Sequence, residues 1–128
     1  MKEFIKSLYF GDRYCEKMEV HKGKIIIQIN CISRTEPGNN EWNYYTKDDI
    51  SHGQLTFEDI SFFEMPPNML INDEFYGIDL IEKNAEEYHF KVQGSHILDN
   101  GDYKEIVATI KCKNFYIFNP ANGEKIAK

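Results

Sequence analysis

The densest group of chemically capable side chains is the run Asp48-Asp49-Ile50-Ser51-His52. Carboxylates, a hydroxyl and an imidazole this close together could hold a metal ion or form a nucleophile with its base. Two aspartates before Ile-Ser are also typical of a turn or a helix N-cap. We favour this structural interpretation and predict no chemistry for the run.

The four histidines give no stronger signal. No two of them are two or four residues apart, the spacings at which strands and helices present a pair of metal ligands on one face. We expect His96 to be a hydrogen-bonded histidine at the edge of the core. The nucleophile-elbow, phosphate-loop, dinucleotide, EF-hand and His-Glu-x-x-His motifs are all missing from the sequence. We therefore predict a protein that is not an enzyme, with no catalytic residue, metal site or cofactor.

An aromatic segment offers a different chemistry, the recognition of another molecule. Residues 38–45 read Gly-Asn-Asn-Glu-Trp-Asn-Tyr-Tyr. Rigid aromatic side chains among adaptable asparagines are typical of protein-binding surfaces. We predict that Trp42, Tyr44 and Tyr45 contact a partner, with one alternative open: the same rings could fold back and cap the sheet.

The net charge of -6 comes entirely from the middle of the chain. Residues 58–87 carry nine acidic side chains and one basic side chain, whereas residues 1–57 are balanced and residues 88–128 carry two more bases than acids. A concentrated negative face repels nucleic acids and anionic membranes and attracts a basic protein, although it could also serve solubility alone. The candidate partner-binding residues of this acidic segment are Glu58, Asp59, Asp73 and Glu74.

Strands must position most of these residues. Residues 2–10 predict one short helix, because Phe4, Ile5 and Leu8 share a helical face. Period-two alternation predicts strands over residues 14–21, 24–33, 54–65, 75–82, 87–98, 103–113 and 115–118. We predict a single mainly β (α+β) domain over residues 1–128. About seven mostly antiparallel strands should form a sandwich or a strongly bent, barrel-like sheet beside the short N-terminal helix.

Turn residues set the registers of these strands. Lys22-Gly23 predicts a two-residue hairpin turn that pairs Val20 with Ile25. The apolar alternation slips by one position near Glu58-Asp59, which indicates a bulge or bend. We predict a further turn at Lys113-Asn114.

The cysteines and the N-terminus indicate the compartment. Cys15, Cys31 and Cys112 are odd in number and form no Cys-x-x-Cys pair, so we expect reduced, mostly buried thiols. Lys6 and Ser7 interrupt the apolar N-terminal stretch, which argues against a secretory signal. No apolar run reaches membrane-spanning length. We therefore expect a cytoplasmic protein.

Three segments carry a resemblance to known proteins: residues 8–15 (LYFGDRYC), 24–30 (KIIIQIN) and 53–59 (GQLTFED). They resemble uncharacterised small bacterial β-rich families, of the kind in which immunity proteins of polymorphic toxin systems are found. Such immunity proteins are cytoplasmic, often acidic, and block a cognate toxin by binding it. The resemblance implies an inhibitor that binds a toxin. Together with the acidic segment, the aromatic segment and the missing catalytic motifs, it leads us to expect a non-enzymatic protein-binding module that inhibits a basic toxin domain. Two alternatives stay open: a small-ligand-binding β-barrel or uncharacterised enzyme, and a self-associating domain.

Overall fold

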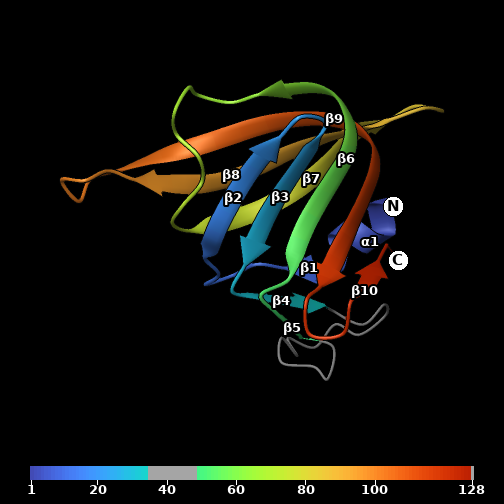
Figure 1. Ribbon diagram of the computed structural model, residues 1–128, viewed down its shortest axis with the longest axis horizontal. Coiled ribbons are helices and arrows are strands. Elements are labelled where there is room, and N and C mark those ends of the chain that lie inside the picture. Colours follow the sequence, from blue (N-terminus) through green and yellow to red (C-terminus); the bar gives the residue numbers. More distant parts are fainter. Residues whose placement is uncertain (35–48, 128) are drawn as a thin grey trace.

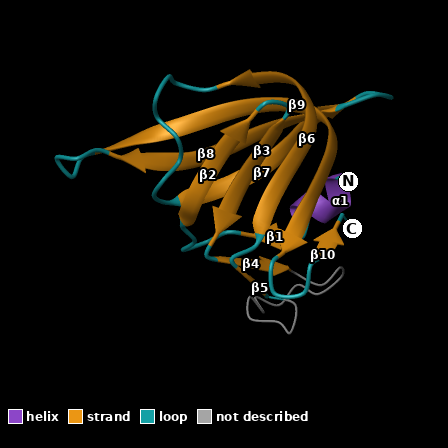
Figure 2. Ribbon diagram, viewed as in Figure 1, coloured by secondary structure: helices purple, strands orange, loops and turns teal. Residues whose placement is uncertain are grey.

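The computed structural model describes residues 1–34 and 49–127 and consists mainly of strands (Figure 1 and Figure 2). In chain order its elements are α1 (Lys2–Lys6), β1 (Leu8–Tyr9), β2 (Cys15–His21), β3 (Lys24–Ile29), β4 (Cys31–Arg34), β5 (Ile50–Ser51), β6 (Gln54–Glu64), β7 (Phe75–Lys83), β8 (Tyr88–Ile97), β9 (Tyr103–Asn119) and β10 (Glu124–Ile126).

The strands form two antiparallel sheets. The larger has the order β2-β3-β6-β9-β8-β7, and β10 also pairs with β9. The smaller has the order β1-β4-β5. In Figure 1 the larger sheet is strongly bent, with α1 beside it. The expected fold class, a mainly β protein with one short helix, is confirmed.

The two outermost strands of the larger sheet, β2 and β7, meet at a single point. Tyr14 and Glu74, at their N-terminal ends, form an isolated antiparallel bridge. The Cys15 N–H donates to the Asp73 carbonyl at 2.7 Å, and the Phe75 N–H donates to the carbonyl of Arg13 at 3.0 Å. We call this junction the seam. It brings together two segments about 60 residues apart in the chain without closing the sheet into a barrel.

The first hairpin has the predicted turn. Gly23 has a φ of +76°, which suits glycine, and Val20 pairs with Ile25 as expected. Farther from the turn a bulge shifts the register, so that Cys15 pairs with Ile29 and is buried in the core. All three cysteines are free, as predicted, and two of them are buried.

The predicted turn at Lys113-Asn114 is wrong, because β9 runs unbroken through it. Lys113 and Asn114 are consecutive exposed residues at which the alternation of β9 changes phase. The neighbouring strand β6 is irregular at the same level: Asp59 has a φ of +56°, and the register shifts between Ile60 and Phe62. The predicted irregularity near Glu58-Asp59 therefore exists, and both strands bend together there.

Aromatic residues from distant elements fill the core. The Phe115 ring on β9 lies 5.0 Å from the rings of Phe57 and Phe90 and 6.3 Å from that of Phe4 on α1, centroid to centroid. The helix is shorter than predicted. Its last turn ends where the Ser7 hydroxyl donates to the carbonyl of Phe4 at 2.6 Å, and the next two residues join the small sheet as β1.

Candidate functional site

Four exposed apolar side chains gather on the outer face of β7, β8 and β9. Tyr76, Ile97, Tyr103 and Val107 expose 44%, 45%, 63% and 44% of their surface, respectively. Ile97 pairs directly with Tyr103, and Val107 lies four residues farther along the same strand, so all three side chains point to one face. Large apolar groups clustered at solvent-facing positions mark an interaction surface. We call these four residues the outer apolar patch.

Carboxylates lie within and beside the outer apolar patch, because residues 103, 105 and 107 share one face of β9. Glu105 lies between Tyr103 and Val107 on β9, and Glu74 lies two residues before Tyr76. Burial raises the pKa of the Tyr76 phenol, and the negative charges of Glu74 and Glu105 raise it further. A tyrosine phenol is protonated at neutral pH even at its ordinary pKa, so Tyr76 can donate a hydrogen bond.

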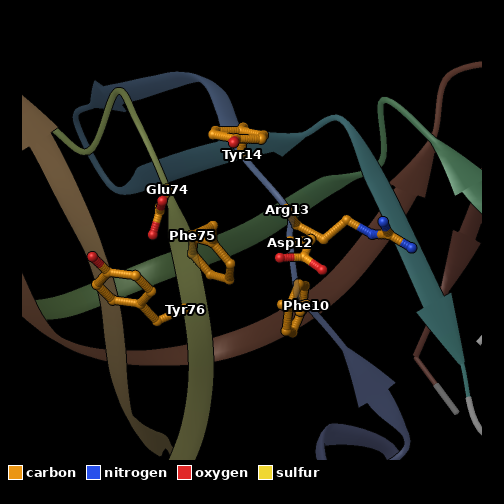
Figure 3. A pocket seen from close by; sticks show the side chains of 8 residues that line it. Phe10, Asp12, Arg13, Tyr14, Glu74, Phe75 and Tyr76 are labelled. Carbon is orange, nitrogen blue, oxygen red and sulfur yellow. The ribbon is translucent and has the colours of Figure 1, made fainter. Parts of the chain in front are cut away.

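A pocket of about 160 Å³ opens beside the patch, where β2 and β7 meet at the seam (Figure 3). Its floor is formed by Phe10 and Phe75, which are almost fully buried and pack edge to face with ring centroids 4.9 Å apart. Its rim carries the half-exposed rings of Tyr14 and Tyr76. We call it the seam pocket. An apolar floor with a polar rim suits a single side-chain-sized group.

The acidic and basic side chains of the seam pocket point in different directions. In Figure 3 the Glu74 side chain lies between Tyr14 and Tyr76, whereas the Arg13 side chain extends away from them toward β4. There an Nη of Arg13 donates to the buried Ser33 hydroxyl at 2.9 Å. The arginine thus joins the two sheets and leaves the open part of the pocket to the carboxylates.

Two shallower hollows extend the seam pocket. One, of about 410 Å³, lies between α1, β1 and the outer edge of β7, and the other, of about 370 Å³, lies over β8 and β9 beside Val107. Tyr76 lines both hollows and the seam pocket. The concave surface is therefore continuous around this one side chain.

Of the predicted site residues that the structure describes, Glu74 lies on this surface and Glu58 and Asp59 lie elsewhere. Trp42, Tyr44 and Tyr45 lie outside the described residues. Glu74 lines the seam pocket. Its neighbour Asp73 does not line this pocket and accepts a hydrogen bond from the buried Ser95 hydroxyl at 3.0 Å.

Glu58 and Asp59 lie at the other end of the first hairpin. Glu58 pairs with Lys24 next to the turn, whereas Glu74 meets the opposite end of β2, so the length of β2 separates them by about 20 Å. Glu58 accepts a hydrogen bond from the Tyr116 hydroxyl at 2.6 Å, which lowers the pKa of this carboxyl, and Asp59 accepts one from the Asn114 amide at 2.6 Å. The structure does not bring the two acidic pairs together.

The polar run that begins at Asp48 forms no cluster in the part of the chain that is described. His52 lies in the turn between β5 and β6, where its Nδ1 is 2.7 Å from the Glu16 carboxylate and helps to lower the pKa of that carboxyl. His96 contacts the Leu70 carbonyl through Nδ1 at 2.7 Å, as expected of a core-edge histidine. Within residues 1–34 and 49–127, no three His, Cys, Asp or Glu side chains are grouped as metal ligands.

Comparisons with known proteins place the chain in a family. A family model described as a family of unknown function, DUF6258, matches residues 1–128. The chain belongs to this family. No curated protein and no solved structure gives a significant match. The family description names no activity, so the function must be inferred from the geometry of the surface.

Sequence reasoning missed the tyrosines and the valine of this surface. Tyr103 and Val107 occupy the outward positions of a strand whose inward positions are apolar, and this double apolar pattern was a readable signal. Tyr14 and Tyr76 gave no such sequence signal, because their proximity depends on the meeting of β2 and β7.

Among the described residues, no helix is both long and apolar enough to cross a membrane.

Proposed function

We propose that this protein is a cytoplasmic, non-enzymatic binding module that blocks a basic toxin domain, as an immunity protein does. The observation that carries the proposal is the outer apolar patch together with the carboxylates Glu74 and Glu105 that lie beside and within it. Exposed aromatic and aliphatic side chains supply contact area for a partner, and the neighbouring carboxylates favour partners of opposite charge.

Charge supports a basic partner. The four acidic residues that line the seam pocket and the two hollows are Asp12, Glu74, Asp79 and Glu105. The two bases that line them are Lys6 and Arg13, and the guanidinium of Arg13 donates to Ser33. The surface is therefore net negative, which accelerates encounter with a positively charged protein and disfavours acidic ones.

The proposal is tested by affinity capture from the native host with a matched pair of variants. Val107 on the patch and Val20 on β2 are both 44% exposed, so Val107→Lys and Val20→Lys make the same chemical change at the same exposure. We expect the wild-type chain to retain one basic protein that is released by high salt. Val107→Lys should reduce this capture at least tenfold, and Val20→Lys should leave it unchanged.

A second arm tests inhibition itself. The captured protein, produced alone, should arrest growth of its host, and co-production of the wild-type chain should relieve the arrest. Capture of nothing, capture of the chain by itself, or capture that survives Val107→Lys would overturn the proposal. Capture of itself would favour the self-associating alternative.

A further inference from the structure

We propose that the seam pocket receives one cationic side chain, an arginine or a lysine, of the basic partner. This inference rests on the proposed function and specifies how the partner is recognised. It requires that the pocket have the right size, that its negative charge be uncompensated, and that it adjoin the surface on which the partner lies.

The size of the pocket fits one side-chain end group. Its volume of about 160 Å³ is close to that of an engineered cavity of about 150 Å³ that accommodates a benzene molecule. The floor formed by Phe10 and Phe75 is apolar, so the methylene stem of a lysine or arginine can pack on it while the charged end stays at the rim.

The rim is suited to a positive charge. Glu74 lies between the rings of Tyr14 and Tyr76 (Figure 3), and the faces of tyrosine rings attract cations. In the described part of the chain, no ion pair involves Glu74 or Asp12. The arginine of the pocket wall cannot easily supply the missing charge, because its guanidinium is held by Ser33 on the far side.

The pocket adjoins the outer apolar patch through a shared residue. Tyr76 lines both the seam pocket and the hollow that contains Glu105 and Val107. A partner lying on the patch therefore brings its own side chains to the mouth of the pocket. Docking on the patch and insertion of a cation are two contacts of a single interface.

A titration of the isotope-labelled, full-length protein tests the subsite without the partner. The probes are N-acetyl-arginine methylamide, N-acetyl-lysine methylamide and the neutral N-acetyl-citrulline methylamide, which matches arginine in shape. We expect a cationic probe to shift the backbone amide resonances of residues 13–14 and 74–76 in a saturable manner. Citrulline should bind at least fivefold more weakly, and the tighter of the two cations identifies the preferred side chain.

Two glutamate variants provide the matched comparison. Glu74→Gln removes the charge from the pocket, and Glu86→Gln removes the same charge from the exposed turn at the opposite end of β7. We expect Glu74→Gln to weaken binding of the cationic probe at least threefold and Glu86→Gln to leave it unchanged, with both variants retaining the wild-type melting temperature. Equal binding of citrulline, or binding that is insensitive to Glu74→Gln, would overturn the subsite.

The same variants separate the subsite from the broader function. If Val107→Lys abolishes capture of the basic partner while Glu74→Gln leaves both capture and its salt dependence intact, the binding function stands and the cation subsite is wrong. If the wild-type chain captures no partner, the proposed function fails whatever the probes show.

Discussion

Replacement of Phe115 by alanine should remove the central contact of the aromatic core. The ring is 3% exposed and packs against three others, from α1, β6 and β8. Truncating a buried phenylalanine to alanine costs about 3–5 kcal/mol through lost transfer free energy and the cavity left behind. A domain of this size is stable by about 5–15 kcal/mol in total, so the variant should fold but lose a large share of that stability.

Urea unfolding followed by far-ultraviolet circular dichroism measures this loss. With a denaturant slope of about 2 kcal/mol per molar, a loss of 4 kcal/mol moves the midpoint by about 2 M. The control is Phe118→Ala, three residues away on β9, where the side chain is only half-buried and the loss should be about 1 kcal/mol. Equal midpoint shifts for the two variants would refute the central role of Phe115.

The remaining predictions concern the hydrogen-bonded pair Tyr116–Glu58 and two glycines. Because of burial and the hydrogen bond to Glu58, the pKa of the Tyr116 phenol is raised to about 12. An absorbance titration, read as wild type minus Tyr116→Phe, should show this ionisation near pH 12 rather than 10. Because the pKa of Tyr116 is raised, the contribution of the Tyr116–Glu58 pair to the free energy of unfolding should decrease as the pH rises from 10 toward 12. Because the pKa of Glu58 is lowered, the same contribution should also decrease as the pH falls below 4.5 through the lowered carboxyl pKa. Gly94→Ala should cost about 1–3 kcal/mol in urea unfolding, because the new Cβ would lie 2.6 Å from Ile71 Cγ2, whereas Gly77→Ala meets nothing within 4 Å and should change stability little. Similar losses at the two glycines would contradict this packing.

Local signals explain which parts of the fold could be predicted. The Val20–Ile25 pairing follows from a glycine that adopts a positive φ in a two-residue turn. The prediction of a turn at Lys113-Asn114 was wrong, because two consecutive polar residues are as typical of a bend in a long strand as of a turn. Only the pairing of this segment with the irregular part of β6 distinguishes them.

The candidate site was predictable only in part, for a related reason. Glu74 could be chosen because the acidic segment is visible in the composition. Tyr14 joins it only because two strands far apart in the chain meet at the seam, and Tyr76 becomes a rim residue at the same place. A single sequence contains no local signal for such a long-range meeting. The Arg13–Ser33 contact between the two sheets could not be predicted for the same reason, because it depends on how distant segments pack.

The position of β9 in the sheet also has a consequence for biosynthesis. β9 is the only described strand that pairs with both β6 and β8, and it begins at Tyr103. On the ribosome, the β2-β3-β6 unit and the β7-β8 hairpin are therefore made with open strand edges and no common neighbour. Open edges of this kind pair with other chains and favour aggregation. Until residues 103–119 have emerged, the two half-sheets lack the strand that joins them, apart from their contact at the seam, and their open edges are available to other chains.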